Sequence, residues 1–197
     1  MGLRYLYKKA YEPAPLVAAA VALALVCAPA RAGECGSKTP DYTANRTLSV
    51  GGKTITSLVA VSGDKMREEQ HLGSHKLILL HLFGERKEYI IDPERKMASS
   101  IQAPANGRQP NMETRIVEEK GADGLTVRHA QFKSRDKWVE LSTTSCRADG
   151  VMARQTFYSM DPQGRIVSGR ISQSDIRVGP LPANLFELPS DVTIKAP

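Results

Sequence analysis

From residue 77 to residue 83 the chain reads Leu77-Ile78-Leu79-Leu80-His81-Leu82-Phe83. Side chains alternate between the two faces of a strand. One face of this run therefore carries Leu77, Leu79 and Phe83, and the other carries Ile78, Leu80 and Leu82. A strand that is apolar on both faces is covered on both sides. The run predicts a sheet with further structure packed over its central strands.

The rest of the chain surrounds this run with short segments of β-forming residues, separated by turn sequences. Gly51-Gly52 is a two-residue hairpin signal, and Asp92-Pro93 and Asp161-Pro162 begin turns in which proline presets the second position. The strands expected between the turns are 43–50, 53–61, 65–72, 76–83, 87–91, 96–102, 125–132, 137–144, 151–159 and 165–177. We therefore expect a mainly β fold of the α+β class, built on a curved antiparallel sheet.

For three segments the sequence pattern does not decide between alternative structures. Residues 112–120 are the one credible helix, although their few apolar residues support a strand nearly as well. Residues 65–70 and 166–177 mix charge into both faces, which favours edge or exposed strands. The charged run 64–69 is expected to be a solvated edge strand, with a lipid-headgroup or partner contact through Lys65 and Arg67 as the alternative.

The N-terminal residues have the three parts of a secretory signal. Arg4, Lys8 and Lys9 give a positive start, residues 16–28 are an unbroken apolar run, and Ala30-Arg31-Ala32 fits the small-x-small cleavage rule. As a helix the run spans about 20 Å, which is short against a hydrocarbon core of about 30 Å. We expect residues 1–32 to be a cleavable signal, with an uncleaved anchor as the alternative, and residues 33–197 to form a single exported domain with no stable membrane span.

Composition and cysteine usage narrow the class further. The net charge of +6 falls to about +3 when the leader is subtracted (four basic residues against Glu12), and the basic residues are spread evenly, which argues against nucleic-acid binding. Cys27 leaves with the leader. Cys35 and Cys146 remain as an even pair in an exported chain, which predicts one disulfide.

No catalytic, metal or cofactor site can be recognised in the sequence. Ser62-Gly63-Asp64-Lys65 has the S-x-x-K spacing of some serine acyl enzymes, but it lies between two strands and lacks the partner motifs. His71, His75 and His81 suggest a metal, yet no cysteine or carboxylate cluster completes a ligand set. We therefore expect no enzyme activity, no bound metal and no cofactor.

Three segments resemble periplasmic proteins of the lipoprotein-carrier superfamily, the LolA/LolB-like proteins. Residues 63–69 resemble their GDKxR strand, residues 89–97 resemble a following hairpin built on Leu-Asp-Pro-Glu, and residues 179–189 resemble a stretch near the end of an uncharacterised branch. The resemblance covers roughly residues 45 to 190 and preserves the order of the segments. It implies an open half-barrel with a helix or loop cover, which can take up hydrophobic material.

Three functions remain open. The first is a non-enzymatic periplasmic or secreted protein that binds a hydrophobic or lipid-like group or a lipoprotein, since concave apolar surfaces are natural ligand sites. The second is an envelope module that docks a protein partner without a small ligand, and the third is an unrecognised hydrolase. The residues expected to line the ligand site are Leu77, Leu79, Phe83, Tyr89, Ile91, Trp138 and Phe157.

Overall fold

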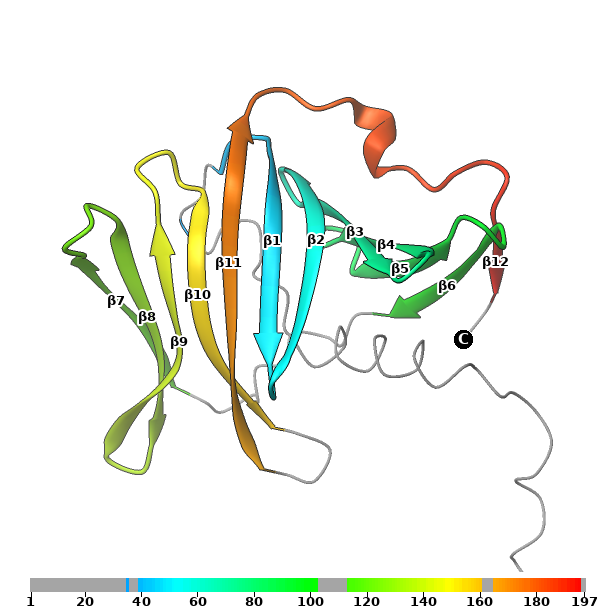
Figure 1. Ribbon diagram of the computed structural model, residues 1–197. Coiled ribbons are helices and arrows are strands. Elements are labelled where there is room, and N and C mark those ends of the chain that lie inside the picture. Colours follow the sequence, from blue (N-terminus) through cyan, green and yellow to red (C-terminus); the bar gives the residue numbers. More distant parts are fainter. Residues whose placement is uncertain (1–34, 36–38, 103–112, 161–164, 196–197) are drawn as a thin grey trace, which may run out of the picture.

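The computed structural model describes residues 35, 39–102, 113–160 and 165–195. These residues form one twelve-stranded sheet (Figure 1). The leader predicted at residues 1–32 and the turn predicted at Asp161-Pro162 lie outside the described residues. The strands are β1 (Tyr42–Val50), β2 (Lys53–Ser62), β3 (Lys65–Leu72), β4 (His75–Leu82), β5 (Lys87–Asp92), β6 (Met97–Gln102), β7 (Thr114–Lys120), β8 (Thr126–Ser134), β9 (Lys137–Cys146), β10 (Met152–Met160), β11 (Ile166–Val178) and β12 (Thr193–Lys195).

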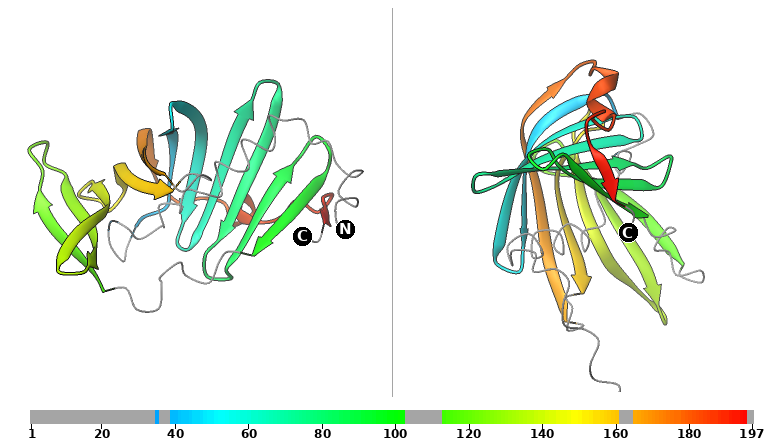
Figure 2. Two further views of the ribbon diagram at one scale, coloured as in Figure 1. Left: turned by 90° about the horizontal axis from the view of Figure 1, so that it is seen from below. Right: turned by 90° about the vertical axis from the view of Figure 1, so that its right-hand side faces the viewer.

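The sheet consists of two meanders joined at its middle. Strands β1 to β6 follow one another across one half, and β7 to β11 follow one another across the other half. The halves meet where β1 pairs antiparallel with β11. Strand β12 adds to β6 in parallel, so β7 and β12 lie at opposite ends of an open sheet. Figure 2 shows its strong curvature. The predicted curved, open antiparallel sheet is confirmed.

Local sequence explains both the turns and the curvature. Gly51 and Gly52 have φ angles of 57° and 76°, which are the left-handed values that a two-residue hairpin of this type requires. The register shifts between Thr43 and Asn45 in β1 and between Met152 and Arg154 in β10. Such bulges bend a strand and increase its twist.

Different parts of the chain pack on the two sides of the sheet. On the side that we call the disulfide face, Cys35 packs on a buried cluster made of Leu48, Val50, Met152 and Ile171. Residues Tyr42 and Ala44 alternate in phase with Leu48 along β1, so a second buried cluster lies on this same face. Its members are Tyr42, Ala44, Val59, Val61, Met66 and Val151.

The opposite side, the C-terminal face, is covered over β2 to β6 by the segment that follows β11. This segment crosses to the far edge of the sheet (Figure 1) and contains a short 3-10 helix, η1 (Ala183–Phe186). Phe186 is only 4% exposed and packs in a cluster with Ala60, Ile78, Leu80, Ile91 and Ala98. Arg67 also donates a hydrogen bond of 3.4 Å to the Leu185 carbonyl. The loop cover expected over the central strands is therefore present on this face.

The structure corrects three expectations about individual segments. Residues 114–120 form strand β7 rather than a helix, since β8 pairs with it along all seven residues. Strand β3 is not an edge, because it pairs with both β2 and β4. Strand β11 is largely exposed, as its charges suggest, yet it lies at the middle of the sheet between β1 and β10.

Candidate functional site

The disulfide face brings apolar side chains from both halves of the sheet to one side. Leu77 and Leu79 come from β4, and they are 7% and 8% exposed. Phe83 follows β4 in the same alternation and packs on the Tyr42 cluster. Phe157 comes from β10 in the other half and packs on the Leu48 cluster. Both phenylalanines keep intermediate exposure, so the face has a buried centre and partly open aromatic rings.

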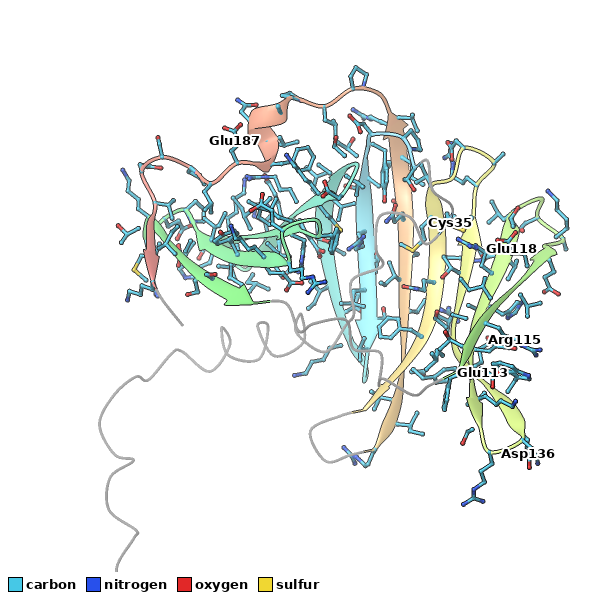
Figure 3. All side chains as sticks on the ribbon, turned by 180° about the vertical axis from the view of Figure 1, so that it is seen from behind. Cys35, Glu113, Arg115, Glu118, Asp136 and Glu187 are labelled. Atoms are coloured by element: carbon cyan, nitrogen blue, oxygen red, sulfur yellow. A yellow bond between two sulfur atoms is a disulfide. The ribbon has the colours of Figure 1, made fainter. Side chains whose placement is uncertain are left out.

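The disulfide fixes the segment before β1 against this face. The Cα atoms of Cys35 and Cys146 are 5.4 Å apart. Figure 3 views the sheet from the side opposite to that of Figure 1, and Cys35 lies on the side nearer the viewer there. The predicted pairing is confirmed. The position of Phe157 is fixed in another way, because a Cβ added to Gly169 would lie 2.2 Å from the Phe157 ring. The ring therefore lies directly over the backbone of β11.

A buried ion pair lies among these apolar residues. Arg46 alternates in phase with Ala44 and Leu48, so it points to the disulfide face. Its Nη1 atom is 3.0 Å from Oε2 of Glu68 on β3, and the two side chains are 5% and 10% exposed. Gln70 donates a hydrogen bond of 3.0 Å to the other carboxylate oxygen, Oε1. Both oxygens of Glu68 are thus satisfied by groups of the sheet.

These neighbours decide the charge state of Glu68. Burial raises the pKa of a carboxyl group, but the Arg46 guanidinium and hydrogen bonds from Gln70 and Ser57 outweigh it and hold the pKa of Glu68 below its usual value. Glu68 is therefore ionised at neutral pH. The charges of the pair compensate each other, which leaves this part of the face without net charge.

The polar contacts continue onto the next two strands. His81 on β4 is 6% exposed, and its Nδ1 atom is 3.4 Å from Oε1 of Glu88 on β5. The Phe83 ring stacks on the His81 ring, with centroids 5.7 Å apart and planes 12° from parallel. We call Arg46, Glu68, His81 and Glu88 the polar row. It crosses the disulfide face from β1 to β5 and ends beside Phe83.

The seven residues expected to line a ligand site do not share one surface. Four of them lie on the disulfide face, namely Leu77, Leu79, Phe83 and Phe157. Tyr89 and Ile91 point to the C-terminal face and pack in the cluster of Phe186. Trp138 lies on β9 beyond a register shift at Ala130/Gln131, which turns it to that opposite face as well. The first four therefore share a face, but Phe83 and Phe157 lie on two separate clusters of it.

The polar row is the part of the site that the sequence did not predict. Glu68 lies in a strand charged on both faces, so alternation could not assign it to the interior. Arg46 did carry a signal, because it interrupts the apolar series Tyr42, Ala44, Leu48, Val50 on one face of β1. A single charge in such a series indicates a buried partner.

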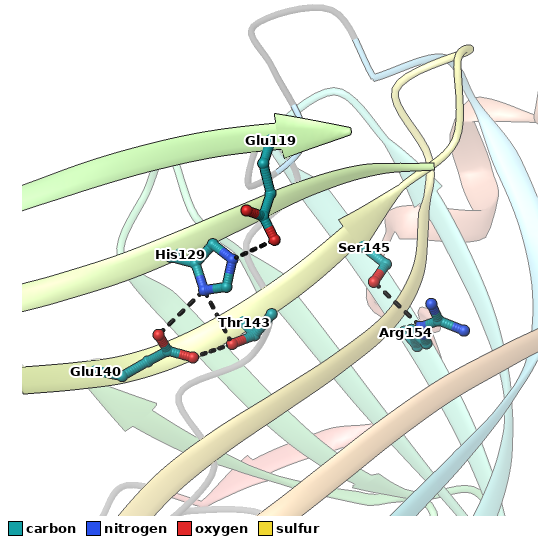
Figure 4. Close-up of polar contacts among 6 residues, drawn as sticks. All are labelled: Glu119, His129, Glu140, Thr143, Ser145 and Arg154. Atoms are coloured by element: carbon teal, nitrogen blue, oxygen red, sulfur yellow. Dashed lines mark hydrogen bonds and ion pairs between the residues drawn. The ribbon is translucent and has the colours of Figure 1, made fainter. Parts of the chain in front are cut away.

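A second polar cluster lies on the C-terminal face of β7, β8 and β9 (Figure 4). His129 Nδ1 is 3.0 Å from Glu140 and its Nε2 is 3.3 Å from Glu119. Burial alone would lower the pKa of His129, but the hydrogen bonds and charges of Glu140 and Glu119 raise it. Thr143 donates its hydroxyl to Glu140. A ring that donates from both nitrogens cannot accept the Thr143 proton, so the cluster does not make a nucleophile and base pair.

The structure also shows where the other motifs noted in the sequence lie. Gly63 and Asp64 form the turn between β2 and β3, as expected for the Ser62–Lys65 segment. His75 pairs with Glu94 at 3.0 Å. Within the described ranges, no group of three or more histidine, cysteine and acidic residues could hold a metal ion. No helix in the part of the chain that the structure describes is long and apolar enough to cross a membrane.

Comparison with solved structures gives several matches over most of the chain. An uncharacterized conserved protein from Thermus thermophilus is 13% identical, with a TM-score of 0.51 over 91% of this chain and 99% of that one. A LolA superfamily protein from Nitrosomonas europaea is 10% identical, with a TM-score of 0.41 over 76% of this chain and 90% of that one. MucB is 14% identical, with a TM-score of 0.43 over 89% of this chain and 64% of that one.

No protein-family model matches the sequence, and no curated protein matches it. At 13% identity, the likeness to the Thermus thermophilus protein shows a shared fold and nothing finer. The chain therefore shares its fold with that uncharacterized protein.

Proposed function

We propose that this chain is an exported, periplasmic, non-enzymatic protein that holds a hydrophobic or lipid-like group on its disulfide face. The observation that carries the proposal is that two phenylalanine rings remain partly exposed on this face, Phe83 on the Tyr42 cluster and Phe157 on the Leu48 cluster. The C-terminal face is filled by the chain's own segment around Phe186. Among the described residues outside the sheet, Cys35 alone joins the cluster under Phe157.

The electrostatics of the face suit an uncharged chain. Arg46 and Glu68 compensate each other at 3.0 Å, so an acyl chain lying on the face meets no unpaired charge. The partly exposed rings of Phe83 and Phe157 offer large apolar area at low conformational cost. The group that best fits such a surface is a long hydrocarbon chain rather than a polar metabolite.

Two further features support the rest of the proposal. A disulfide that joins Cys35 to Cys146 suits an oxidising compartment such as the periplasm. In the best-organised polar cluster, both ring nitrogens of His129 lie within hydrogen-bond distance of carboxylates, those of Glu140 and Glu119. A general base must be free to take a proton, so this cluster does not support a hydrolase.

A fluorescent fatty-acyl probe tests the proposal with a matched pair of variants. Phe83→Ala removes a ring from the disulfide face, and Tyr89→Ala removes a ring from the C-terminal face. We expect Phe83→Ala to weaken probe binding about tenfold or more, while costing much less than the roughly 3–5 kcal/mol typical of a filled core. We expect Tyr89→Ala to lower the denaturation midpoint and leave probe affinity unchanged.

Two results would contradict the proposal. One is the absence of probe binding by the unaltered protein, purified after export of the full chain. The other is a large loss of stability in Phe83→Ala with unchanged probe affinity, which would identify the face as an ordinary filled core.

A further inference from the structure

Strand β7 presents a free edge at one end of the sheet. Within the described residues its sheet partner is β8 on one side only, and all seven of its residues are exposed. Its pairing with β8 runs without a register shift. A regular edge of this kind is a template for a further strand unless it is blunted. The other end of the sheet is blunted, because β12 has only three residues.

The hydrogen bonds at the two ends of β7 show which backbone groups point outward. Lys133 donates its N–H to the Glu113 carbonyl at 2.9 Å, and Gly121 donates its N–H to the Leu125 carbonyl at 2.8 Å. In an antiparallel ladder, residues that bond to the neighbour alternate with residues that do not. The odd-numbered residues from 113 to 121 therefore bond to β8. Those that direct their N–H and C=O groups to the free edge are Thr114, Ile116, Glu118 and Lys120.

We propose that β7 docks against β7 of a second copy of this chain, antiparallel and around a twofold axis at Val117. Identical strands related by a twofold axis must pair outward-pointing residues with outward-pointing residues. The register that satisfies this rule and uses all seven residues pairs 114 with 120 and 116 with 118. It makes about eight main-chain hydrogen bonds between the two copies. The two twelve-stranded sheets then become one continuous sheet.

The side chains of β7 are complementary to themselves in this register. Arg115 lies opposite Glu119 of the other copy, and symmetry repeats the pair. These are non-hydrogen-bonded positions, where side chains approach most closely. Val117 lies opposite its own counterpart, which gives an apolar contact on the axis. Glu118 lies opposite Ile116 of the other copy. Its carboxylate already forms an ion pair of 2.9 Å with Arg128 of its own chain.

This charge pattern argues for a second copy over an unrelated peptide. A strand bearing one sign of charge would repel itself, whereas β7 places Arg115 before its centre and Glu119 after it. The labelled residues Arg115 and Glu118 in Figure 3 mark the exposed strand. The dimer is independent of ligand binding on the disulfide face, so the two proposals fail separately.

Cysteine cross-linking tests the register directly. In the proposed dimer the Cα atoms of the two Val117 residues are about 4.5 Å apart, within the range that a disulfide spans. Val117→Cys is therefore expected to run mostly as a covalent dimer on a non-reducing gel. Arg115→Cys is the matched control on the same face, since its two copies are offset by four residues, about 14 Å. We expect it to cross-link at least several-fold less.

A second pair of variants tests the edge itself. Ile116→Pro removes an N–H that points outward and leaves the ladder with β8 intact, which an edge strand tolerates. Ile116→Thr keeps the N–H and is the control. Light scattering after gel filtration is expected to give twice the chain mass for the unaltered protein and for Ile116→Thr, and a single mass for Ile116→Pro at an unchanged denaturation midpoint.

The proposal is overturned if the unaltered protein is a monomer at every concentration tested, in which case β7 is left for an extended peptide of another protein. It is also overturned if Val117→Cys and Arg115→Cys cross-link equally, or if Ile116→Pro remains dimeric. Should Ile116→Pro fail to fold, the cross-linking comparison decides alone.

Discussion

At the scale of single residues, the main feature is an ionised pair inside an apolar face. A buried ion pair is not in itself a source of stability, since the cost of desolvation can exceed the gain from attraction. Arg46 and Glu68 nevertheless depend on each other, because removal of one leaves the other charged and buried. The charged groups of the interior therefore have to be tested as a pair.

We expect Glu68→Gln to destabilise the protein by about 3–5 kcal/mol, because it leaves Arg46 without its counter-charge. The double variant Arg46→Met/Glu68→Leu fills similar volume without charge, and it is expected to be as stable as the unaltered protein or more so. Chemical denaturation of the three proteins measures this. A double variant as unstable as the single one would show that the pair contributes more than mutual neutralisation.

The same pair makes stability dependent on acid. Because the pKa of Glu68 is lowered in the folded state, its contribution is fully present above the pKa of the unfolded chain, about 4.3. The contribution is lost as the pH falls through the folded-state pKa. The difference in unfolding free energy between the unaltered protein and Glu68→Gln should thus be constant near pH 7 and shrink in acid. A difference that stays constant down to about pH 2, below the usual range of carboxyl pKa values, would contradict this assignment.

At the scale of elements, the sequence predicts most of the sheet because its turns are chemically explicit. The Gly51-Gly52 hairpin and the Asp92-Pro93 turn bound their strands to within one residue. The alternation of Leu77 to Phe83 correctly indicates burial on both faces of β4. The charges of β3 wrongly suggest an exposed strand, because one of them, Glu68, is buried. Its carboxylate is bonded by Arg46 on β1 and by Gln70 on β3 itself. On β3 itself this long-range pairing has no local signature, and the only signal lies on β1, where Arg46 interrupts an apolar series.

Strand β7 and Trp138 show two further limits of sequence reasoning. A short segment with both helical and strand character is decided by its neighbours, and here β8 supplies the partner. The face of Trp138 depends on a register shift between β8 and β9. One extra residue reverses every side chain beyond it, and nothing in the local residues announces the shift.

The C-terminal segment is the element that covers β2 to β6, and Phe186 is its anchor. We expect Phe186→Ala to cost about 3–5 kcal/mol, since the ring is buried against Leu80 and Ile91. Its neighbour Glu187 is exposed (Figure 3), and Glu187→Ala should change stability by less than about 0.5 kcal/mol. Denaturation midpoints of the two variants measure the contrast. Equal midpoints would show that the segment does not hold the face closed.

At the scale of the whole molecule, one covalent link spans most of the chain. Cys35 and Cys146 are separated by 111 positions, and a loop of that length gives a disulfide an entropic contribution of up to about 4–5 kcal/mol. We expect the Cys35→Ser/Cys146→Ser variant to lose about 2–4 kcal/mol. Thiol labelling of the unreduced, denatured protein checks the bond itself. Two reactive thiols at these positions would contradict it.

The proposed position of the apolar group on the disulfide face can be tested by fluorescence quenching with a brominated fatty acid. The chain has a single tryptophan, Trp138, and it lies on the opposite face. In the Trp138→Phe background, Phe83→Trp places the only tryptophan on the disulfide face. The account predicts strong quenching of the tryptophan at position 83 and little quenching of the native Trp138. Equal quenching of both, or strong quenching of Trp138 alone, would contradict it.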